Sequence, residues 1–230
     1  MSAHHTTETP ELAFSRKYDY ACAENYFHKR QSGMARRLSH WRETQIARHA
    51  LQRAGNPASV PDLPCGAGRF WPMLLEQPKR VRLAADNSTD MLQVARSRQS
   101  PEITRRVTTL QTSAFAIDLP NQAVDCVFCM RLLHHIGDVA HRIAMLREFH
   151  RVTRESVVVS LWIDGNYKSW KRQRLERRRL EAERASQNRF ISVRSTIEAE
   201  IRQAGFGLNG HDDFLPAYAM WRVYTLRKGA

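Results

Sequence analysis

Short apolar runs recur along the middle of the chain with the length of β-strands. They span Arg80–Ala85, Arg106–Gln111, Ala123–Met130 and Ser156–Trp162. Runs of this length that alternate with helical stretches are typical of parallel strand–helix–strand units. The most apolar run, Ala123–Met130, is expected at a buried central position, because a strand covered on both faces has no polar side. The pattern therefore predicts an α/β fold.

Helical periodicity fills several of the stretches between these runs. Lys17–Ala54 is predicted to be mostly helical, since apolar residues recur at steps of three and four in its second half. A first core helix is expected at Phe70–Gln77 and a later one at Ser195–Gly205. The last apolar segments, Gly207–His211 and Ala219–Leu226, predict a closing antiparallel pair of strands.

A glycine turn joins the first strand to the first core helix. Val60–Phe70 has the pattern of a short strand, a tight turn and a helix start. Such a turn places free backbone N–H groups and the positive end of a helix dipole at the carboxyl edge of a sheet, where open α/β sheets bind nucleotides. Asp86 ends the next strand at about the distance where such folds hold a ribose hydroxyl, although an Asp there also suits a turn or a cap. These features indicate a nucleoside-containing cofactor.

The residues around the turn narrow the choice of cofactor. A dinucleotide fingerprint needs a third small residue after Gly66 and Gly68, but position 71 is Trp71. A phosphate loop of the Walker kind needs Gly-Lys followed by Ser or Thr, and no such triplet lies near the turn. A ligand with a ribose and an adenine but no phosphate chain remains. S-adenosylmethionine fits that description.

Four stretches in register resemble the motifs of class I S-adenosylmethionine-dependent methyltransferases. Asp62–Phe70 resembles the first motif, usually written Asp-Leu-Gly-Cys-Gly-Thr-Gly. Leu83–Leu92 and Leu119–Phe128 match the second and fourth motifs in order and spacing. Leu132–Ile136 is similar to the Leu-His-His segment that often follows the fourth strand in the small-molecule branch of the family. The resemblance covers residues 17 to 227, and the four motifs together are more specific than any one of them.

The resemblance implies a definite architecture. It predicts a Rossmann-like, seven-stranded, mostly parallel sheet with helices on both faces. Residues 17–230 would form a single methyltransferase domain after a flexible stretch at 1–16. Within the domain, residues 17–54 would form a helical cap over the cofactor. Residues 163–194 would form a basic helical insertion after the fifth strand and would cover the acceptor site.

The resemblance also implies S-adenosyl-L-methionine as cofactor, with S-adenosyl-L-homocysteine as product. Asp86 would accept the ribose hydroxyls, and Asn87 or Met91 would lie beside the adenine. The cofactor-binding residues expected from the motifs are Asp62, Pro64, Cys65, Gly66, Gly68, Arg69, Asp86, Asn87, Met91, Ser113, Ala114, Met130 and Arg131.

Acceptor residues are expected after the fourth and fifth strands and in the cap. His134 and His135 are candidate bases that remove a proton from the acceptor, because histidine titrates in the right range. Alternatively, they cap the following helix and pack. Tyr18, Tyr26 and Arg30 are candidates from the cap, although aromatic residues at such spacings also suit plain packing. The full expected set of acceptor-binding residues is Tyr18, Tyr26, Arg30, His135, Trp162 and Tyr167.

Three residues depart from the pattern of the family. Pro64 stands where the family has its first glycine, and Pro61 lies inside the predicted central strand although proline cannot donate to a sheet ladder. Ser113 occupies a position where many members carry an acidic residue that contacts the adenine amino group. Because Gly66 and Asp86 are present, cofactor binding is still expected.

The composition indicates in which cellular compartment the protein is expected. Residues 1–10 are polar and lack the apolar core of a secretory signal, and no apolar run approaches the roughly 20 residues of a membrane span. Four cysteines in 230 residues suggest reduced thiols, so a cytoplasmic protein without a membrane span is expected. Cys126 and Cys129 form a Cys-x-x-Cys, but residues three apart in a strand point to opposite faces. Core packing is therefore predicted for them, and no metal site.

The formal net charge of +13 raises the question of partners. Lys168–Arg189 contains nine Lys or Arg against three Glu. A charge run of this kind is often only a solvated helix face. Its expected place beside the acceptor opening also suits an anionic or phosphorylated acceptor.

Three functional hypotheses follow. The first is a methyltransferase that acts on an O or N atom of a small or medium-sized, anionic acceptor. The second is an RNA methyltransferase, which the positive charge favours, although the chain has no Asn-Pro-Pro-Tyr type tetrapeptide and no recognisable RNA-binding module. The third, suggested by Pro61, Pro64 and Ser113, is a degenerate methyltransferase fold that acts as a binding protein. The sequence does not predict an oligomeric state.

Overall fold

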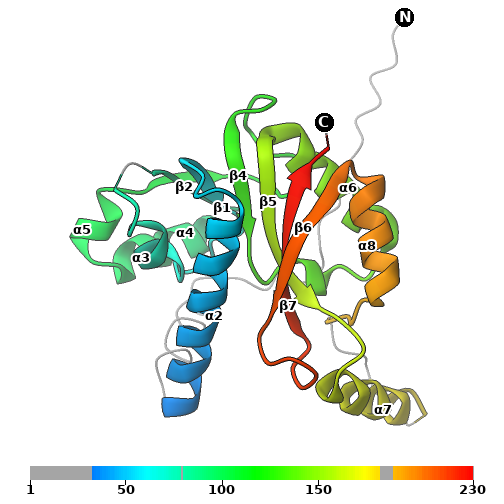
Figure 1. Ribbon diagram of the computed structural model, residues 1–230. Helices are drawn as coiled ribbons and strands as arrows, with labels where there is room; N and C mark the ends of the chain where they lie inside the picture. Colours follow the sequence, from blue (N-terminus) through cyan, green and yellow to red (C-terminus); the bar gives the residue numbers. More distant parts are fainter. Residues whose placement is uncertain (1–32, 79, 182–188, 230) are drawn as a thin grey trace, which may run out of the picture.

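Seven strands form one sheet in the order β3-β2-β1-β4-β5-β7-β6 (Figure 1). The computed structural model describes residues 33–78, 80–181 and 189–229. Strands β1 to β5 are parallel, and β7 runs antiparallel to both β5 and β6. The strands are β1 (Ser59–Asp62), β2 (Val81–Asp86), β3 (Thr108–Gln111), β4 (Val124–Cys129), β5 (Thr153–Trp162), β6 (Phe206–Asp213) and β7 (Trp221–Lys228).

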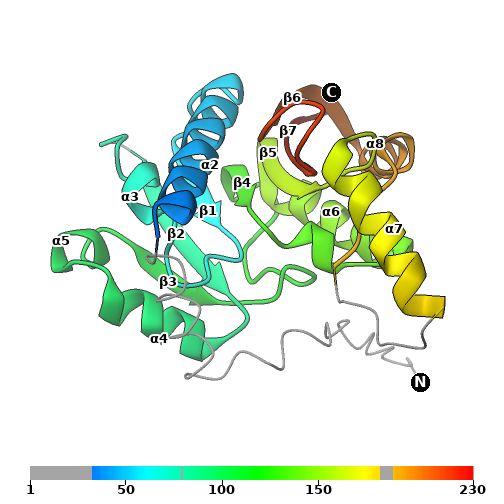
Figure 2. The ribbon, with the colours of Figure 1, turned by 90° about the horizontal axis from the view of Figure 1, so that it is seen from below.

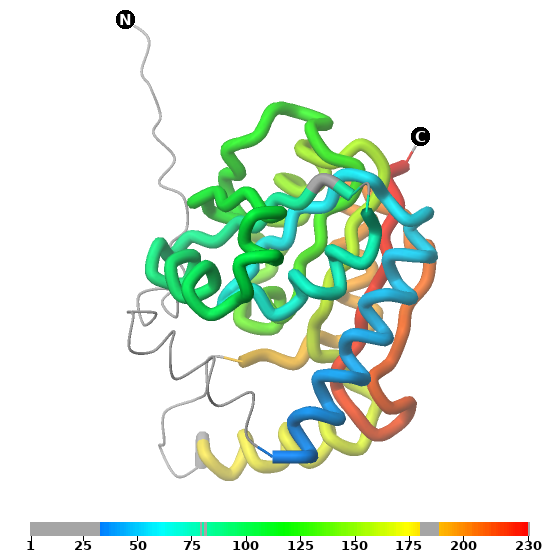
Figure 3. The backbone as a smooth tube through the Cα atoms, turned by 90° about the vertical axis from the view of Figure 1, so that its left-hand side faces the viewer, coloured from blue at the N-terminus to red at the C-terminus, as the bar shows by residue number. Residues whose placement is uncertain are grey.

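The helices cover both faces of the sheet. Helices α2, α3 and α4 pack on one face, and α6 and α8 pack on the other. Helix α2 runs alongside β6 and β7, as Figure 3 shows. The helices are α2 (Met34–Arg53), α3 (Trp71–Leu74), α4 (Thr89–Arg98), α5 (Pro101–Thr104), the 3₁₀ turn η2 (Leu133–His135), α6 (Val139–Val152), α7 (Tyr167–Glu181) and α8 (Arg194–Gln203).

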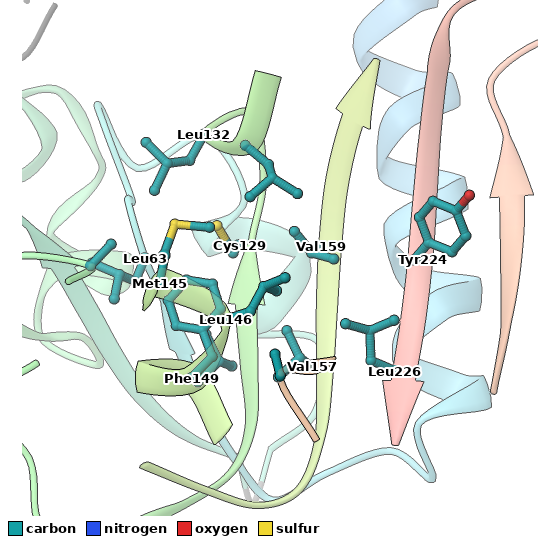
Figure 4. Packing of buried hydrophobic residues seen from close by; sticks show 14 of the residues in the cluster. Leu63, Cys129, Leu132, Met145, Leu146, Phe149, Val157, Val159, Tyr224 and Leu226 are labelled. Carbon is teal, nitrogen blue, oxygen red and sulfur yellow. The ribbon is translucent and has the colours of Figure 1, made fainter. Parts of the chain in front are cut away.

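The largest core cluster lies between the sheet and helices α6 and α8 (Figure 4). Met145 and Phe149 of α6 pack there with Cys129, while Cys126 belongs to the cluster on the opposite face. The prediction that the two cysteines point to opposite faces is therefore confirmed. Burial raises the pKa of Cys126 to about 11, so its thiol keeps its proton. Among the described residues, no group of three or more His, Cys, Asp or Glu side chains has the arrangement of a metal site.

The predicted sheet is confirmed, but the first core helix is shorter than expected. The expectation of a helix over Phe70–Gln77 is wrong in extent, because α3 spans only Trp71–Leu74. The N–H of Glu76 bonds the carbonyl of Met73, three residues back, at 3.2 Å. This bond joins residues three apart, as in a 3₁₀ turn, instead of four apart as in an α-helix, and the helix ends there.

Pro61 does lie inside β1, opposite Leu83 of β2. On the other side, the pairing of β1 with β4 is limited to Asp62 and Phe128, one residue after the proline. The N–H of Leu63 then bonds the carbonyl of Phe128 at 2.9 Å. Proline has no N–H to donate, and the short contact with β4 agrees with that loss.

Helices α2 and α7 both extend past the carboxyl edge of the parallel strands (Figure 1), and Figure 2 looks onto this edge. The start of α7 is held by the loop between β6 and β7, since the N–H groups of Tyr167 and Lys168 bond the carbonyls of Ala217 and Tyr218, each at 3.0 Å. The chain returns at residues 189–193, where the N–H of Ser192 bonds the carbonyl of Trp162 at 2.8 Å. These segments surround the edge where a nucleotide is expected. Among the described residues, no helix is both long and apolar enough to cross a membrane.

Candidate functional site

The glycine turn after β1 is closed against the end of β2. Gly66 and Gly68 have φ angles of +51° and +69°, a left-handed conformation that glycine adopts without strain. The N–H of Cys65 bonds the carbonyl of Ala85 at 2.8 Å, and the N–H of Gly66 bonds Oδ2 of Asp86 at 2.9 Å. A Cβ at Gly68 would lie 2.8 Å from the ring of Trp71, which is buried. Only a glycine therefore fits at this point of the turn.

Asp86 is the last residue of β2 and its carboxylate is buried. Its second oxygen, Oδ1, accepts a hydrogen bond from the N–H of Ser88 at 3.0 Å. Burial raises the pKa of Asp86, and the N–H groups of Ser88 and Gly66 oppose that rise. The N–H of Asn87 is a third donor to this carboxylate, and because a carboxylate has about four acceptor sites, capacity remains for a ligand hydroxyl. The carboxylate of Asp86 is thus joined to the glycine turn by a direct hydrogen bond.

The other residues predicted from the motifs follow the carboxyl ends of the same strands. Thr112, which precedes Ser113, donates its N–H to the carbonyl of Asp86 at 3.0 Å, so the segment after β3 lies beside Asp86. The Ser113 hydroxyl accepts from the N–H of Phe115 at 3.2 Å. Of the remaining predicted residues, Asp62, Cys65, Met91, Ala114 and Met130 are buried, Pro64 is half-buried and Asn87 is exposed.

A buried carboxylate that the sequence reasoning missed joins two of the predicted arginines. Glu43 of α2, 5% exposed, pairs with both Arg69, directly after the turn, and Arg131, directly after β4. The Arg131 Nε donates to Glu43 Oε1 at 3.1 Å, and the Arg69 Nε donates to Nδ1 of His40, also on α2, at 3.0 Å. One signal was available: Glu43 continues the buried stripe of the helix that runs through Ile46. A charged residue on an apolar stripe indicates a buried partner.

This cluster carries more positive than negative charge. The pKa of Arg69 is lowered to about 10, chiefly by burial; Glu43 opposes the lowering and the charge of Arg131 contributes to it. Within the cluster of Glu43, Arg69 and Arg131, two guanidinium groups face one carboxylate. A buried charge is costly unless it is paired. An anionic group of a ligand is the natural partner for the excess charge.

His134 lies inside an aromatic cluster. Its ring stacks on Trp162 at 4.8 Å between centroids and meets Trp221 edge-on at the same distance. The pKa of His134 is lowered to about 2, chiefly by burial and also by the charges of His135, Arg189, Arg131 and Arg172. The imidazole is therefore neutral at physiological pH, and protonating it is costly.

His135 is half-buried, and its ring centroid lies 4.0 Å from that of His134. The alternative in which the histidines cap the next helix is wrong, because Asp138 caps α6 by accepting the N–H of His141 at 2.9 Å. The packing part of that alternative holds for His134.

The predicted acceptor residues are only partly brought together. Trp162, at the end of β5, is buried against His134, whereas Tyr167, at the start of α7, is exposed and stacks on Tyr218 at 5.6 Å. Tyr18, Tyr26 and Arg30 lie outside the described residues.

The side chains at this edge fit an S-adenosylmethionine molecule. Asp86 offers acceptor sites for ribose hydroxyls, and the left-handed glycines bring backbone close to a ligand. Arg69 and Arg131 offer excess positive charge for a carboxylate.

Comparison with known proteins agrees with this fit. Residues 60–156 match the model of a methyltransferase domain family. This match, which covers less than half of the chain, supports a class I S-adenosylmethionine-dependent methyltransferase. These comparisons support an enzyme with S-adenosylmethionine as its cofactor. A search of the curated proteins found no match to the sequence.

Solved structures with low sequence identity share the fold. One is the magnesium protoporphyrin IX methyltransferase from Synechocystis PCC 6803 with bound S-adenosylhomocysteine, with a TM-score of 0.72 and 13% identity over 95% of this chain and 100% of that one. The mitomycin 7-O-methyltransferase has a TM-score of 0.70 and 15% identity, covering 96% of this chain and 62% of that one. A putative methyltransferase from Haloferax volcanii, in complex with the Trm112 activator, has a TM-score of 0.66 and 16% identity over 96% and 100% of the two chains.

Gly68→Ala should destabilise the turn of this methyltransferase and weaken cofactor binding. The new Cβ would clash with the buried Trp71 ring in addition to adopting a left-handed backbone. Gly165→Ala is the matched control, because Gly165 has a φ of +75° and no atom within 4 Å of its Cβ position. Urea unfolding should show about 1 kcal/mol lost for the control and clearly more for Gly68→Ala. An equal loss for the two variants would contradict the close approach of Trp71.

Glu43→Gln should lower the free energy of unfolding by about 3 kcal/mol, because it leaves the nearly buried Arg69 and the half-buried Arg131 without a carboxylate. Glu76→Gln is the control, since Glu76 also pairs with an arginine of α2, Arg48, but on the exposed surface. Its loss should stay below about 1 kcal/mol. Chemical denaturation followed by circular dichroism measures both. Similar losses of unfolding free energy for the two variants would contradict a stabilising buried pairing of Glu43 with the two arginines.

Proposed function

We propose that this methyltransferase moves a methyl group to an O or N atom of a small or medium-sized, anionic acceptor. The observation that carries the proposal is the set of guanidinium groups beside the end of β4 and β5. Arg131 lies 4.9 Å over the Trp221 ring, and Arg172 lies 4.7 Å over the Trp162 ring. Positive charge at the mouth of an active site raises the local concentration of an anionic substrate.

The cofactor would lie along the carboxyl ends of β1, β2 and β4. In this proposal Asp86 accepts the ribose hydroxyls, and the backbone of Gly66 and Gly68 approaches the methionine part of the cofactor. Arg69 and Arg131 face its carboxylate. The adenine is flanked by Asn87, Met91, Ser113 and Ala114, and the rest of the site is completed by Asp62, Pro64, Cys65 and Met130.

The acceptor would enter between the two segments that extend past the sheet. We assign residues 17–54 to a cap and 163–194 to an insertion within one domain, 17–230. Tyr18, Tyr26 and Arg30 of the cap, with His135, Trp162 and Tyr167, are proposed to contact the acceptor. The free thiols of Cys65, Cys126 and Cys129 suit the reducing conditions of the cytoplasm, where we place the reaction.

The protein's main contribution to catalysis is to orient the acceptor. S-adenosylmethionine supplies a methyl group that is already activated on a sulfonium. Holding the acceptor atom in line is worth roughly 7 to 11 kcal/mol of the barrier. If the acceptor carries a proton, His135 is better placed to receive it than His134, since His134 is buried and surrounded by positive charge.

Two of the structurally similar methyltransferases support a small acceptor. One acts on magnesium protoporphyrin IX and the other is a 7-O-methyltransferase of mitomycin. Transfer of a radiolabelled methyl group from S-adenosylmethionine to a panel of small organic acids and their neutral analogues tests the acceptor class. Transfer to neutral compounds alone would contradict it.

Asp86→Asn should weaken the binding of S-adenosylhomocysteine by about 10- to 100-fold, because a charged acceptor of hydroxyl protons is replaced by a neutral amide. Asp90→Asn, in the first turn of α4, removes a carboxylate of the same strand–helix unit that does not contact the turn. It should leave the affinity unchanged. Isothermal titration calorimetry measures both, and unchanged binding by Asp86→Asn would contradict the proposed role.

A second candidate is methyl transfer to RNA, which the exposed face of α7 favours. Arg174, Arg177 and Arg178 are exposed there beside Trp170, and Arg174 lies 5.7 Å over the Trp170 ring. If RNA is the acceptor, its binding should fall steeply with salt, and changing the three arginines to Gln should reduce the slope of log affinity against log salt by about 2 to 3. Filter binding at several salt concentrations measures this. A shallow slope that the variants leave unchanged would exclude RNA.

A further inference from the structure

An exposed apolar loop lies against the basic helix α7. The loop between β6 and β7 is exposed over Leu215–Tyr218 and carries no charge there. Its Leu215 and Tyr218 side chains are each 46% exposed. The N–H groups of Tyr167 and Lys168, the first two residues of α7, bond carbonyls of this loop, each at 3.0 Å. The loop Leu215–Tyr218 and the exposed side of α7 therefore form one surface, which we call the α7 face.

Aromatic side chains of α7 continue the apolar surface of the loop. Tyr167 stacks on Tyr218 at 5.6 Å between ring centroids, and Trp170 lies 6.2 Å from Tyr167. Trp170 is 52% exposed and Tyr167 is 49% exposed. Large apolar side chains that are exposed together, beside polar ones, mark a binding surface.

Basic side chains lie among these aromatic ones. Lys171, Arg174 and Arg178 are exposed. They lie on the side of α7 that carries Tyr167 and Trp170, because residues three and four apart share one face of a helix. The guanidinium of Arg174 lies 5.7 Å over the Trp170 ring. The α7 face thus combines aromatic and cationic groups.

Acidic side chains near the α7 face are paired with arginines. The exposed residues of Tyr167–Arg179 include no Asp or Glu. Glu176 is half-buried and pairs with Arg179 at 3.8 Å. Asp212 and Asp213, which come just before the loop, pair with arginines of α2 and β7. The face therefore carries an excess of positive charge, and an anionic partner complements it.

A layer of anionic headgroups above acyl chains matches both properties of the face. Trp and Tyr side chains favour the boundary between headgroups and acyl chains, and Lys and Arg side chains near it are attracted to acidic lipids. We propose that the α7 face docks on the surface of an anionic phospholipid membrane. The loop Leu215–Tyr218 and Trp170 would lie at the depth of the headgroups, and Lys171, Arg174 and Arg178 would face lipid phosphates.

Single-stranded RNA is the other polyanion that a basic and aromatic face binds, and it does so by stacking bases on open rings. On the α7 face the rings have other partners. Tyr167 and Tyr218 stack on each other, the Lys168 Nζ lies 5.3 Å over the Tyr218 ring, and Arg174 lies over Trp170. The uncharged tip of the loop offers no group for a phosphate, whereas lipid would bury its apolar side chains. The loop therefore favours lipid.

The start of α2 extends past the same edge of the sheet as α7 (Figures 1 and 3). Arg42 of α2 donates from Nε to the carbonyl of Phe214, just before the exposed tip of the loop, at 3.1 Å. The turns of α2 before Arg42 expose Met34, Leu38 and Trp41. Docking by the α7 face would therefore bring the carboxyl edge, where we propose that the cofactor and acceptor bind, to the membrane surface.

Co-sedimentation with lipid vesicles tests the charge requirement and does not depend on methyl transfer. Vesicles of phosphatidylcholine with about 30% phosphatidylglycerol should bind the protein at least about tenfold more tightly than vesicles of phosphatidylcholine alone. Changing Lys171, Arg174 and Arg178 together to Gln should remove most of this difference. No binding to either vesicle, or equal binding to both, would overturn the proposal.

The matched control for the charge variant changes three exposed arginines at the opposite edge of the sheet. Arg105 precedes β3, Arg202 lies at the end of α8 before β6, and Arg227 lies near the end of β7. Changing these three to Gln lowers the net charge by the same amount and should leave vesicle binding unchanged. An equal loss in both variants would show that only the total charge matters and would overturn docking by the α7 face.

The apolar requirement is tested with Trp170→Ala and Leu215→Ser, singly and together. The double variant should bind anionic vesicles about tenfold more weakly, because less apolar surface enters the headgroup layer. Leu208→Ser is the control, since Leu208 is also exposed but lies near the start of β6, at the opposite edge. Unchanged binding by the double variant would overturn the membrane proposal. A labelled oligouridylate that binds the α7 face, while vesicles do not bind the protein, would assign the face to RNA instead.

Discussion

The carboxylate of Glu43, held between Arg69 and Arg131, fixes the geometry on which the site depends. Arg69 follows β1 and Arg131 follows β4, and the order of the strands reverses between these two. Ligands of open α/β sheets bind at that reversal, because the loops on either side diverge there. A single buried carboxylate from α2 therefore sets the spacing of the two loops and joins them to the helix that extends past the edge.

Positive charge is distributed unevenly about the carboxyl edge of the sheet. The places where arginines gather there say more about candidate ligands than the net charge of +13 does. Glu43 neutralises one of two arginines beside the glycine turn, and farther along the edge Arg172 and Arg189 share one indole ring. In the proposed function, the cofactor carboxylate would pair with the first excess of positive charge and an anionic acceptor with the second. The exposed arginines of α7 add a field that draws anions toward the same opening.

The sequence predicted the sheet, the glycine turn after β1 and the place of Asp86 at the end of β2, because these depend on local patterns and on motif spacing. It did not predict Glu43, whose role appears only when α2 packs against loops that lie far from it in the chain. The sequence also did not predict that the His134 imidazole is neutral. Its burial requires Trp162 and also Trp221, which comes from a strand near the end of the chain. The sequence also did not predict the early end of α3, because that end depends on a single hydrogen bond between residues three apart, from the N–H of Glu76 to the carbonyl of Met73.

A crystal structure of the enzyme with S-adenosylhomocysteine is the most direct test of the central claim, which is that the carboxyl edge of β1, β2 and β4 holds the cofactor. The account predicts density for the ribose against Asp86 and for the amino-acid carboxylate against Arg69 and Arg131. Density for the ligand elsewhere, or an empty edge at a saturating concentration, would contradict it.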